Sequence, residues 1–545
     1  MLCPFPYQRD AIRNIVARWR SGVSVLCRGS VGTGKTLIAL ESLRAYGAWP
    51  ALVVVPLAVL AQWRDEARRL GWRDRHLLLY HGNFRSLDTF YKWRVVVTTP
   101  DTLRRELDAS GPLARPRWRT VVVDEAHTLR RGVALQEEEE GAPTLVYANK
   151  TYLAIEREVL RPRRPRLLLL TATPFINSWT DLLALGRWLG GGPARGTLES
   201  WRAGGSARAM LERHCVDVAT PPLPATRVVE VPHTLTQAER AAYRRCHTEV
   251  VVRLCRYLHG GGERRGARRR RALHAFLSRL TALRRGAVHP RFFAPAGRRR
   301  RGRRGAGPAA PRRSSKFVAV LRLLESAALR RRKAVIFCGF REPLRELRRF
   351  LRDRLPGRRC RVHFGGRAAA NRRALERFER SRTPDLLLAT RRSMGVGVNI
   401  PCANDVIMLD RDFSQPLEEQ AIGRVRRPHR QAEKRWTAYY VTPTDDEVMR
   451  WMAALQRAKD HTGGALMRGS SAAAAAAADT RSELRLMDAT PPLLGEAAAR
   501  WEALRVRCDR PVGDLDAAWG SLRRCLGLGA ERGAQRSLPA ALPHR

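Results

Sequence analysis

The sequence predicts an α/β protein with two parallel β-sheets in tandem. Short apolar runs of strand length alternate with segments of helical periodicity, and this alternation stops near residue 190 and resumes at Lys316. Such alternation is typical of a parallel sheet with helices on both faces. We therefore expect four regions: an N-terminal α/β domain over residues 1–220, a helical and arginine-rich linker over 221–315, a second α/β domain over 316–465 and a low-complexity tail over 466–545.

Composition indicates a basic globular protein. Of its 545 residues 44% are hydrophobic and 28% charged, the formal net charge is +51, and no apolar run reaches the length of a membrane span. Only seven of the 102 basic residues are lysines. A GC-rich coding genome explains arginine in place of lysine, but it does not explain a twofold surplus of bases over acids. A surface that attracts nucleic acid is therefore favoured over a merely solvated excess of charge.

Ten cysteines are scattered along the chain, without a C-x-x-C pair or a Cys/His cluster at zinc spacing. We therefore expect reduced thiols and no structural metal. The N-terminus lacks the basic region and apolar stretch of a signal peptide, which predicts an intracellular protein.

A glycine-rich loop near the N-terminus carries the first chemical signal. An apolar run over residues 23–27 leads into the loop GSVGTGKT at 29–36, and apolar residues at helical spacing follow it. Backbone N–H groups of such a loop can surround a polyphosphate, its lysine can reach the β- and γ-phosphates, and its threonine can hold Mg²⁺. A glycine turn that merely precedes Lys-Thr is disfavoured, because strand, loop and helix occur in the right order. The expected nucleotide-binding residues are Gly29, Gly32, Gly34, Lys35 and Thr36.

The first domain continues with further strands, and one of them ends in two acids. At the carboxyl end of a parallel strand beside a phosphate loop, Asp124 can hold Mg²⁺ through water and Glu125 can orient or deprotonate an attacking water. A solvated acidic turn is the weaker alternative. Residues 132–148, with four glutamates in a row, indicate a surface insertion. The expected strands are 51–56, 77–82, 95–100, 120–127 and 167–174, with helices at 9–19 and 57–70.

The linker and the second domain complete the predicted order. Between residues 190 and 315 we expect helices around 236–257 and 271–285, separated by glycine and arginine runs. The arginine run at 297–304 predicts a disordered tract, which could contact phosphates, act as a nuclear import signal or simply be solvated. The expected strands of the second domain are 334–338, 361–364, 385–390 and 405–410.

Two arginines in the second domain point to a site shared by both domains. Arg424 and Arg427 lie three residues apart on a stretch with helical character, so both can face one way. Two solvated arginines are an equal alternative on this motif alone. Across a cleft from the phosphate loop, the pair could neutralise charge that develops on a γ-phosphate.

Together these motifs resemble helicase superfamily 2, and most closely its SWI/SNF-type DNA translocases. The resemblance covers residues 5–445, and its motifs follow one another in the family's order. They are PYQ at 6–8, the phosphate loop at 29–36, VPL at 55–57 with QW at 62–63, DEAH at 124–127, LTATP at 170–174, HP at 289–290, SK at 315–316, IF at 336–337, ATR at 389–391, GVGVN at 395–399 and the arginine pair at 424 and 427.

The resemblance implies two RecA-like lobes and an ATP hydrolase that uses ATP and Mg²⁺ and moves along duplex DNA. It implies adenine contact by Gln8, phosphate binding by Lys35 and water activation by Glu125. It further implies metal binding by Thr36 and Asp124, and arginine fingers at Arg424 and Arg427. The residues that would couple the nucleotide site to nucleic acid, or lie on the nucleic-acid track or between the lobes, are His127, Thr171, Thr173, Thr390, Arg391, Asn399 and Gln420.

Two positions depart from the SWI/SNF pattern and leave alternatives open. Gly423 stands where this branch has an acid, and Ala172 where it has glycine, so strand-separating helicases and viral transcription NTPases remain possible. A catalytically silent scaffold subunit and an RNA-directed enzyme are further alternatives. Double-stranded DNA is the favoured partner, with protein partners for targeting and no membrane. We expect the nucleus or a viral replication compartment, with the cytoplasm as the alternative.

Overall fold

A computed structural model of the chain places two large β-sheets in one compact unit and a pair of long helices in another. The first unit includes Met1–His233 and Lys316–Thr444, and the second includes Thr234–Ser315. The predictions for the arginine run at 297–304 and the tail at 466–545 lie outside the described residues. The structure describes residues 3–30, 32–82, 93–129, 133–136, 144–147, 149–172, 179–190, 205–218, 226–259, 265–293, 313–365, 368–394, 400, 402–412, 415–425 and 436–444.

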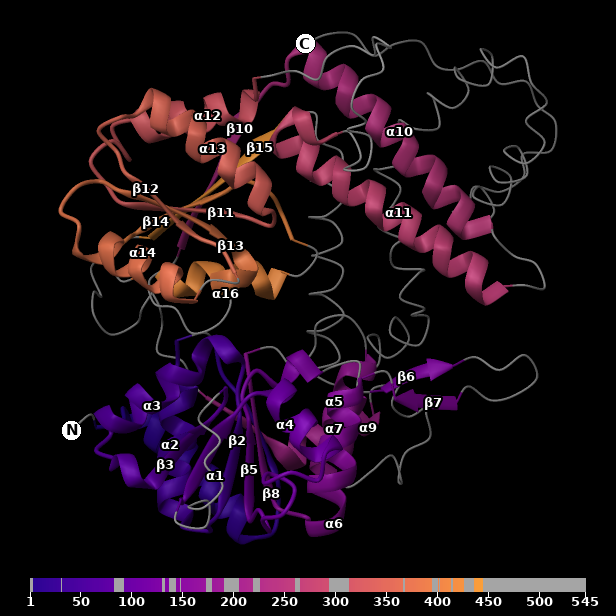
Figure 1. Ribbon diagram of the computed structural model, residues 1–545, viewed down its shortest axis with the longest axis vertical. Helices are drawn as coiled ribbons and strands as arrows, with labels where there is room; N and C mark the ends of the chain where they lie inside the picture. The colour runs from indigo at the N-terminus through magenta and orange to yellow at the C-terminus, as the bar shows by residue number, and fades with distance from the viewer. Residues whose placement is uncertain are drawn as a thin grey trace. The chain divides into compact units, whose positions relative to one another are not determined.

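The first sheet has seven strands in the order β3-β4-β2-β5-β8-β1-β9, and all its pairings are parallel (Figure 1). All six strands predicted for this domain are confirmed. The edge strand β9 was not predicted, because three residues that end in an exposed aspartate give no pattern. The strands are β1 (Val25–Arg28), β2 (Ala51–Val54), β3 (Leu77–Tyr80), β4 (Val95–Thr98), β5 (Thr120–Val123), β8 (Arg166–Thr171) and β9 (Cys215–Asp217).

Helices cover both faces of this sheet, because its strands are apolar on both sides. Successive strand residues point to opposite faces, and each face has its own hydrophobic cluster. Trp19 and Trp63 belong to the cluster under α1, α2 and α3, and Tyr152 and Trp188 to the one under α4, α5 and α7. These helices are α1 (Pro6–Arg20), α2 (Lys35–Tyr46), α3 (Leu60–Arg69), α4 (Pro100–Asp108), α5 (Lys150–Ile155) and α7 (Trp179–Gly190), and α9 (Gly205–His214) follows them.

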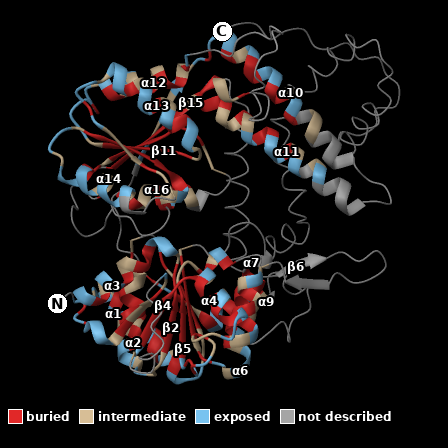
Figure 2. Cartoon of the chain, in the orientation of Figure 1, coloured by how far each residue is buried: buried red, intermediate tan, exposed pale blue. Residues whose placement is uncertain are grey.

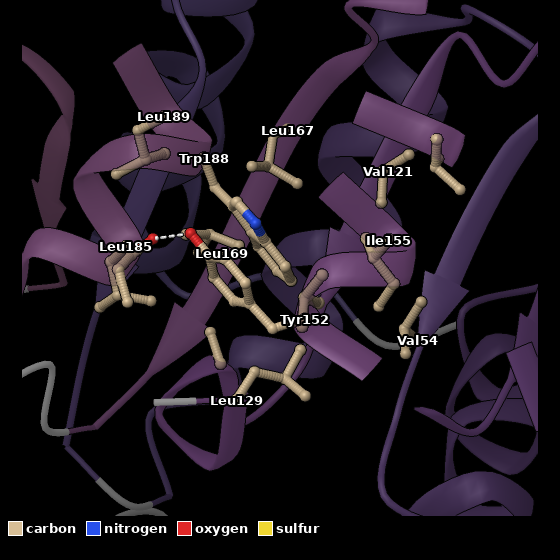
Figure 3. Packing of buried hydrophobic residues seen from close by; sticks show 14 of the residues in the cluster. Val54, Val121, Leu129, Tyr152, Ile155, Leu167, Leu169, Leu185, Trp188 and Leu189 are labelled. Carbon is tan, nitrogen blue, oxygen red and sulfur yellow. Dashed lines mark hydrogen bonds between the residues drawn. The ribbon is translucent and has the colours of Figure 1, made fainter. Parts of the chain in front are cut away.

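Aromatic packing anchors the second of these clusters (Figure 3). The rings of Tyr152 and Trp188 stack with centroids 4.5 Å apart, and the Tyr152 hydroxyl donates a 2.7 Å hydrogen bond to the carbonyl oxygen of Ala184. This bond satisfies the one polar atom that the Tyr152 side chain brings into the core, so α5 and α7 pack without a buried unpaired hydroxyl at this position.

The predicted surface insertion contains a two-stranded antiparallel sheet of its own. Strand β6 (Val133–Gln136) pairs with β7 (Thr144–Tyr147), with Val133 opposite Tyr147. Four-residue strands beside a run of glutamates give too short an alternation to be recognised.

The second sheet has six strands in the order β10-β15-β14-β11-β13-β12, and its pairings are also parallel. The four strands predicted for it are confirmed. Strands β10 and β15 were not predicted, and β10 lies inside residues 221–315, where we expected only a helical linker. The strands are β10 (Thr226–His233), β11 (Ala334–Cys338), β12 (Cys360–His363), β13 (Leu386–Thr390), β14 (Asp405–Met408) and β15 (Trp436–Pro443).

The physical reason for missing β10 is its position at the edge of the sheet. Arg227, Val228, Glu230 and Pro232 are exposed, so the strand lacks the apolar pattern of its neighbours. It is held by pairing with β15, which lies far along the chain. The linker prediction therefore needs correction at residues 226–233.

Most of the remaining helices have both buried and exposed residues, as the colours of Figure 2 show. Helix α13 buries Leu344, Leu347 and Leu351 and exposes most of its arginines. In the second unit, the expected helices around 236–257 and 271–285 are confirmed. The helices are α10 (Gln237–His259) and α11 (Arg265–Val288) in that unit, and α12 (Ser315–Glu325), α13 (Arg341–Arg354), α14 (Ala368–Arg380), α15 (Arg391–Met394) and α16 (Gln415–Val425) around the second sheet.

Candidate active site

The glycine-rich loop joins β1 to α2, as the sequence predicts. Gly32 and Gly34 have φ angles of +93° and +82°, the left-handed region that favours glycine. A Cβ atom at Gly34 would lie 2.3 Å from Nε2 of Gln8, so a larger residue does not fit there. Gly34 is also the residue that precedes α2, whose first backbone N–H groups lack partners within the helix. This helix N-terminus is suited to bind an anion such as a phosphate.

Lys35 is the first residue of α2, and its side chain bends back over the loop. Its Nζ donates hydrogen bonds to the carbonyl oxygens of Gly29 at 2.7 Å and Ser30 at 3.1 Å. Burial lowers the pKa of Lys35, while the carboxylates of Glu125 and Asp124 act in the opposite direction. The two acids and the lysine are therefore close enough to interact electrostatically, as a polyphosphate and Mg²⁺ site requires.

Gln8 lies beside the loop and braces it. The side chain is 3% exposed; its Nε2 donates to the carbonyl oxygen of Thr33 at 2.9 Å, and its Oε1 accepts from the backbone N–H of Phe5 at 2.9 Å. The hydroxyl of Tyr7 reaches the same Thr33 oxygen at 3.3 Å. Gln8 is thus tied to the phosphate loop, and its contact with an adenine remains a prediction.

The two acids lie at the carboxyl end of β5, as predicted. Asp124 accepts hydrogen bonds from Nε1 of Trp63 at 3.1 Å and from the backbone N–H of Glu125 at 2.9 Å. Burial, with a further contribution from the charge of Glu125, raises the pKa of Asp124 to about 6. Trp63 lies on α3, and its indole N–H orients the Asp124 carboxylate. The sequence showed Trp63 as part of a motif, but it did not indicate this contact.

Glu125 is connected to the end of the neighbouring strand through His127. Its backbone has a φ of +49°, which is unusual for a residue other than glycine. Oε2 of Glu125 lies 3.3 Å from Nδ1 of His127, and the same nitrogen lies 3.2 Å from Oγ1 of Thr171, the last residue of β8. The structure therefore brings together three of the predicted residues. Thr173 lies outside the described residues.

Helix α16, which lies between β14 and β15 of the second sheet in sequence, also contacts Glu125. Nε2 of Gln420 donates a 3.0 Å hydrogen bond to Oε1 of Glu125. Arg424, one turn further along α16, is 8% exposed; burial lowers its pKa, and Glu125 and Asp124 act in the opposite direction. Gln420, expected as a coupling or nucleic-acid residue, is thus bonded to the acidic pair in the structure, and the role of Arg424 as an arginine finger stays a prediction. Arg427 lies outside the described residues.

Thr390 and Arg391 were expected on the nucleic-acid track or between the lobes, and that role stays a prediction for both. The Arg391 side chain is 1% exposed and is enclosed by acids of its own lobe. Thr390 is also buried, and its Oγ1 accepts a 3.3 Å hydrogen bond from the N–H of Ser393. Arg391 and Arg392 are consecutive in α15, and Arg392 is the exposed one of the two. Asn399 lies outside the described residues.

These features define a class of protein. Two helix-covered parallel sheets supply a phosphate loop, an acidic pair and an arginine to one site, as in two-lobed nucleotide-binding motors of RecA-like fold. Two family models agree: one for an SNF2-related domain matches residues 7–207, and one for a helicase conserved C-terminal domain matches residues 315–429. The chain belongs to the SNF2-related proteins of helicase superfamily 2.

Curated relatives are similar over part of their length. The chain is 23% identical over 477 residues to the chromatin remodeling factor mit1 of Schizosaccharomyces pombe, which covers 81% of this chain and 31% of mit1. It is 26% identical over 205 residues to the ATP-dependent DNA helicase DDM1 of Arabidopsis thaliana, which covers 34% of this chain and 24% of DDM1. The chain thus spans less than a third of these relatives, and they give no support to a viral origin.

A solved structure titled as the Sulfolobus solfataricus SWI2/SNF2 ATPase core in complex with dsDNA also matches. It covers 89% of this chain and 97% of its own, with 18% identity and a TM-score of 0.36. Among the helices that the structure describes, none is long and apolar enough to cross a membrane.

Proposed function

We propose that this protein is a nucleic-acid-stimulated ATPase that uses ATP hydrolysis to move along duplex DNA. The observation that carries the proposal is the double attachment of Glu125. It follows β5 of the first sheet, and Gln420 of α16 in the second lobe donates a hydrogen bond to its carboxylate. A general base that both lobes hold makes hydrolysis depend on how the lobes are arranged, which is what a motor needs.

The first lobe supplies the groups that bind the nucleotide. We assign phosphate binding to the loop N–H groups and to Lys35, whose ammonium already lies among loop carbonyl oxygens. The hydroxyl of Thr36 and the carboxylate of Asp124 are oxygen donors of the kind that Mg²⁺ prefers. Mg²⁺, when bound, neutralises charge on the β- and γ-phosphates. Gln8 is the proposed adenine contact.

The hydrolytic step is assigned to residues around the acidic pair. Glu125 orients the attacking water and takes its proton, since its carboxylate is buried and held by Gln420 on one oxygen and close to His127 on the other. Arg424 neutralises charge that develops on the γ-phosphate, and Arg427 is proposed as the second arginine finger. Thr171, through its contact with His127, would couple the state of the nucleotide site to the nucleic-acid-binding surface.

Duplex DNA as the track is supported by charge and by relatives. DDM1 is named a DNA helicase, and the net charge of +51 favours a polyanion. Contacts to the phosphate backbone carry little sequence information. We therefore expect weak base preference and an affinity for DNA that falls steeply with salt concentration. Thr173 and Asn399 remain proposed track residues, and the exposed Arg392 is a better candidate than Arg391.

The domain boundaries and the setting of the protein are proposals as well. We propose an ATP-binding lobe over residues 1–220, a linker over 221–315 and a second lobe over 316–465 to which β10 contributes an edge strand. The name of mit1 as a chromatin remodeling factor favours a nuclear role with protein partners for targeting.

The test is steady-state ATP hydrolysis by the full chain with no nucleic acid, duplex DNA, single-stranded DNA or RNA, with Lys35→Ala as the blank. Stimulation by duplex DNA that disappears in the variant supports the translocase. Preference for single strands would instead favour a strand-separating helicase or a viral-type NTPase, and preference for RNA an RNA-directed enzyme. Absence of hydrolysis under all four conditions would favour a catalytically silent scaffold subunit.

A further inference from the structure

A buried ionic network lies at the carboxyl ends of the strands in the second sheet, with Arg391 at its centre. The guanidinium forms a bidentate pair with Asp410, Nη1 to Oδ1 and Nη2 to Oδ2, both at 2.8 Å. Nη1 also donates to the carbonyl oxygen of Asp410 at 2.7 Å, and Nε lies 3.3 Å from Oδ2 of Asp412. Such planar two-point pairing fixes the orientation of both partners, which a single charge contact would not do.

The strand next to β13 is built to admit this pair. Gly339, directly after β11, donates its N–H to Oδ1 of Asp410 at 2.9 Å. A Cβ atom at Gly339 would lie 2.7 Å from Nη2 of Arg391 and 3.0 Å from Oδ2 of Asp410. The backbone therefore leaves room for the ion pair, and the ends of β11, β13 and β14 are joined by one set of bonds.

The network continues into α16. The N–H of Asp412 donates a 2.5 Å hydrogen bond to Oε1 of Glu418, which is 2% exposed on that helix. Oε2 of Glu418 accepts from the Tyr440 hydroxyl at 3.3 Å and lies 3.5 Å from Nη1 of Arg411. The Arg411 guanidinium in turn covers the Tyr440 ring, 3.9 Å from its centroid. The first half of α16 is thus fixed by groups of β15 and of the segment after β14.

Helix α16 also carries the groups that reach the acidic pair. Gln420 and Arg424 follow Glu418 on the same helix, and Gln420 is hydrogen-bonded to Glu125. Any rotation or shift of α16 about Glu418 therefore moves both groups. A displacement of about 1 Å at a catalytic group can lower the rate about a hundredfold.

We propose that Arg391 is a positioning residue for ATP hydrolysis. It holds Asp410 and Asp412, which through Glu418 set α16 so that Gln420 and Arg424 meet Glu125. This inference rests on the proposed ATPase function. It also replaces the expectation that Arg391 contacts nucleic acid, because such a contact would break a fully buried bidentate ion pair.

The test compares Arg391→Lys with Arg392→Ala, its exposed neighbour. Arg391→Lys keeps the charge but loses the two-point geometry. We expect a fall in kcat of about 10- to 100-fold with little change in the KM for ATP, and with unchanged duplex affinity and salt dependence. A variant that keeps wild-type kcat, or one that loses only duplex affinity as a phosphate contact would, overturns the inference. Arg392→Ala shows what loss of one surface charge does to the salt dependence.

A double-mutant cycle with Gln420→Ala tests the route through α16. If Arg391 acts by placing Gln420, the two substitutions together lower kcat less than the product of their separate effects. Strictly multiplicative effects contradict that route. If Arg391→Lys does not fold, Tyr440→Phe removes only the hydroxyl bonded to Glu418, and it must lower kcat in the same non-multiplicative way. A wild-type chain without ATPase activity refutes the proposed function itself, whereas an active wild type with a fully active Arg391→Lys refutes only this inference.

Discussion

Charged side chains lie at the carboxyl ends of the strands in both sheets, but they are paired differently. We call these two regions the first and the second edge. At the first edge, Lys35 is held by backbone carbonyl oxygens, and Asp124 accepts from an indole N–H and a backbone N–H. Neither side chain is thus hydrogen-bonded to an opposite charge within the part of the chain that the structure describes. At the second edge, Arg391 is saturated by two aspartates. The charged groups at the phosphate loop are therefore free of strong internal ion pairs among the described residues, whereas Arg391 is paired with acids of its own lobe.

This contrast suggests how a two-lobed motor divides its work. A site that binds a polyphosphate keeps its charges weakly paired, because strong internal pairs would compete with the ligand. A lobe that presents an arginine and a glutamine from one helix needs that helix held rigidly, and buried ion pairs provide orientation rather than net stability. Substitutions at each edge can separate the two roles.

The largest loss of ATP hydrolysis is expected for Arg424→Ala, on the helix that contacts Glu125. Loss of an arginine finger lowers kcat by about 10³ to 10⁵ in related chemistry. ATP binding is expected to change little, because the phosphate loop is intact. Single-turnover hydrolysis with a fluorescent ATP-binding assay separates the two. The matched control is Arg373→Ala on the exposed face of α14, which should leave kcat unchanged.

Glu125→Gln is expected to lower hydrolysis by about 10² to 10⁴, because the amide cannot accept the proton of the attacking water. The variant should still bind ATP and duplex DNA. Rapid-quench measurement of hydrolysis together with DNA binding checks this. Turnover at the wild-type rate would remove Glu125 from its proposed role.

Trp63→Phe tests the weakly paired edge with a smaller change. The ring is buried in the core cluster and Phe preserves most of its packing, but the hydrogen bond to Oδ2 of Asp124 is lost. A misplaced metal ligand typically costs about 10- to 100-fold in affinity or activity. We expect a higher Mg²⁺ requirement, measured by titrating Mg²⁺ in the ATPase assay. An unchanged Mg²⁺ dependence would show that Asp124 does not need Trp63.

The smallest effect concerns stability at the other end of the second sheet. Asp405 is fully buried; Nε of Arg332 lies 3.2 Å from its Oδ2, and neither carboxylate oxygen accepts a hydrogen bond from the described residues. Burial raises the pKa of Asp405 to about 6, above the value of about 4 in an unfolded chain. Its contribution to stability is therefore lost as the pH rises from about 4 to about 6, and the loss persists at higher pH.

Asp405→Asn should consequently stabilise the protein at pH values of about 7 to 8 by roughly 1 kcal/mol, allowing for the solvent that screens Arg332. Thermal unfolding at about pH 4.5 and about pH 7.5 measures it, and the gain should shrink at the lower pH. The matched control is Asp385→Asn, since Asp385 is equally buried but accepts a 2.6 Å hydrogen bond from Oγ1 of Thr383. That variant should lose stability, and a gain there would contradict the explanation.

Local patterns predicted most of the first lobe and the core of its site. The phosphate loop needs glycines and Lys35 at set positions within one short segment, and Asp124 and Glu125 directly follow a buried strand. Interior strands are apolar on both faces, so their runs are recognisable without knowledge of their neighbours. The position of Arg424 on a helix was likewise visible from spacing alone.

Contacts between distant parts of the chain account for what spacing cannot express. Edge strand β10 exists because β15 pairs with it, although the two are far apart in sequence. Whether Arg391 or Arg392 faces inward depends on where Asp410 lies, and the role of Trp63 depends on where β5 ends beside α3. Residue order alone establishes which chemical groups the protein has and which interior strands it forms. Only the folded chain decides which charges are paired and buried and which are left to meet a ligand, because burial and pairing depend on residues distant in the sequence.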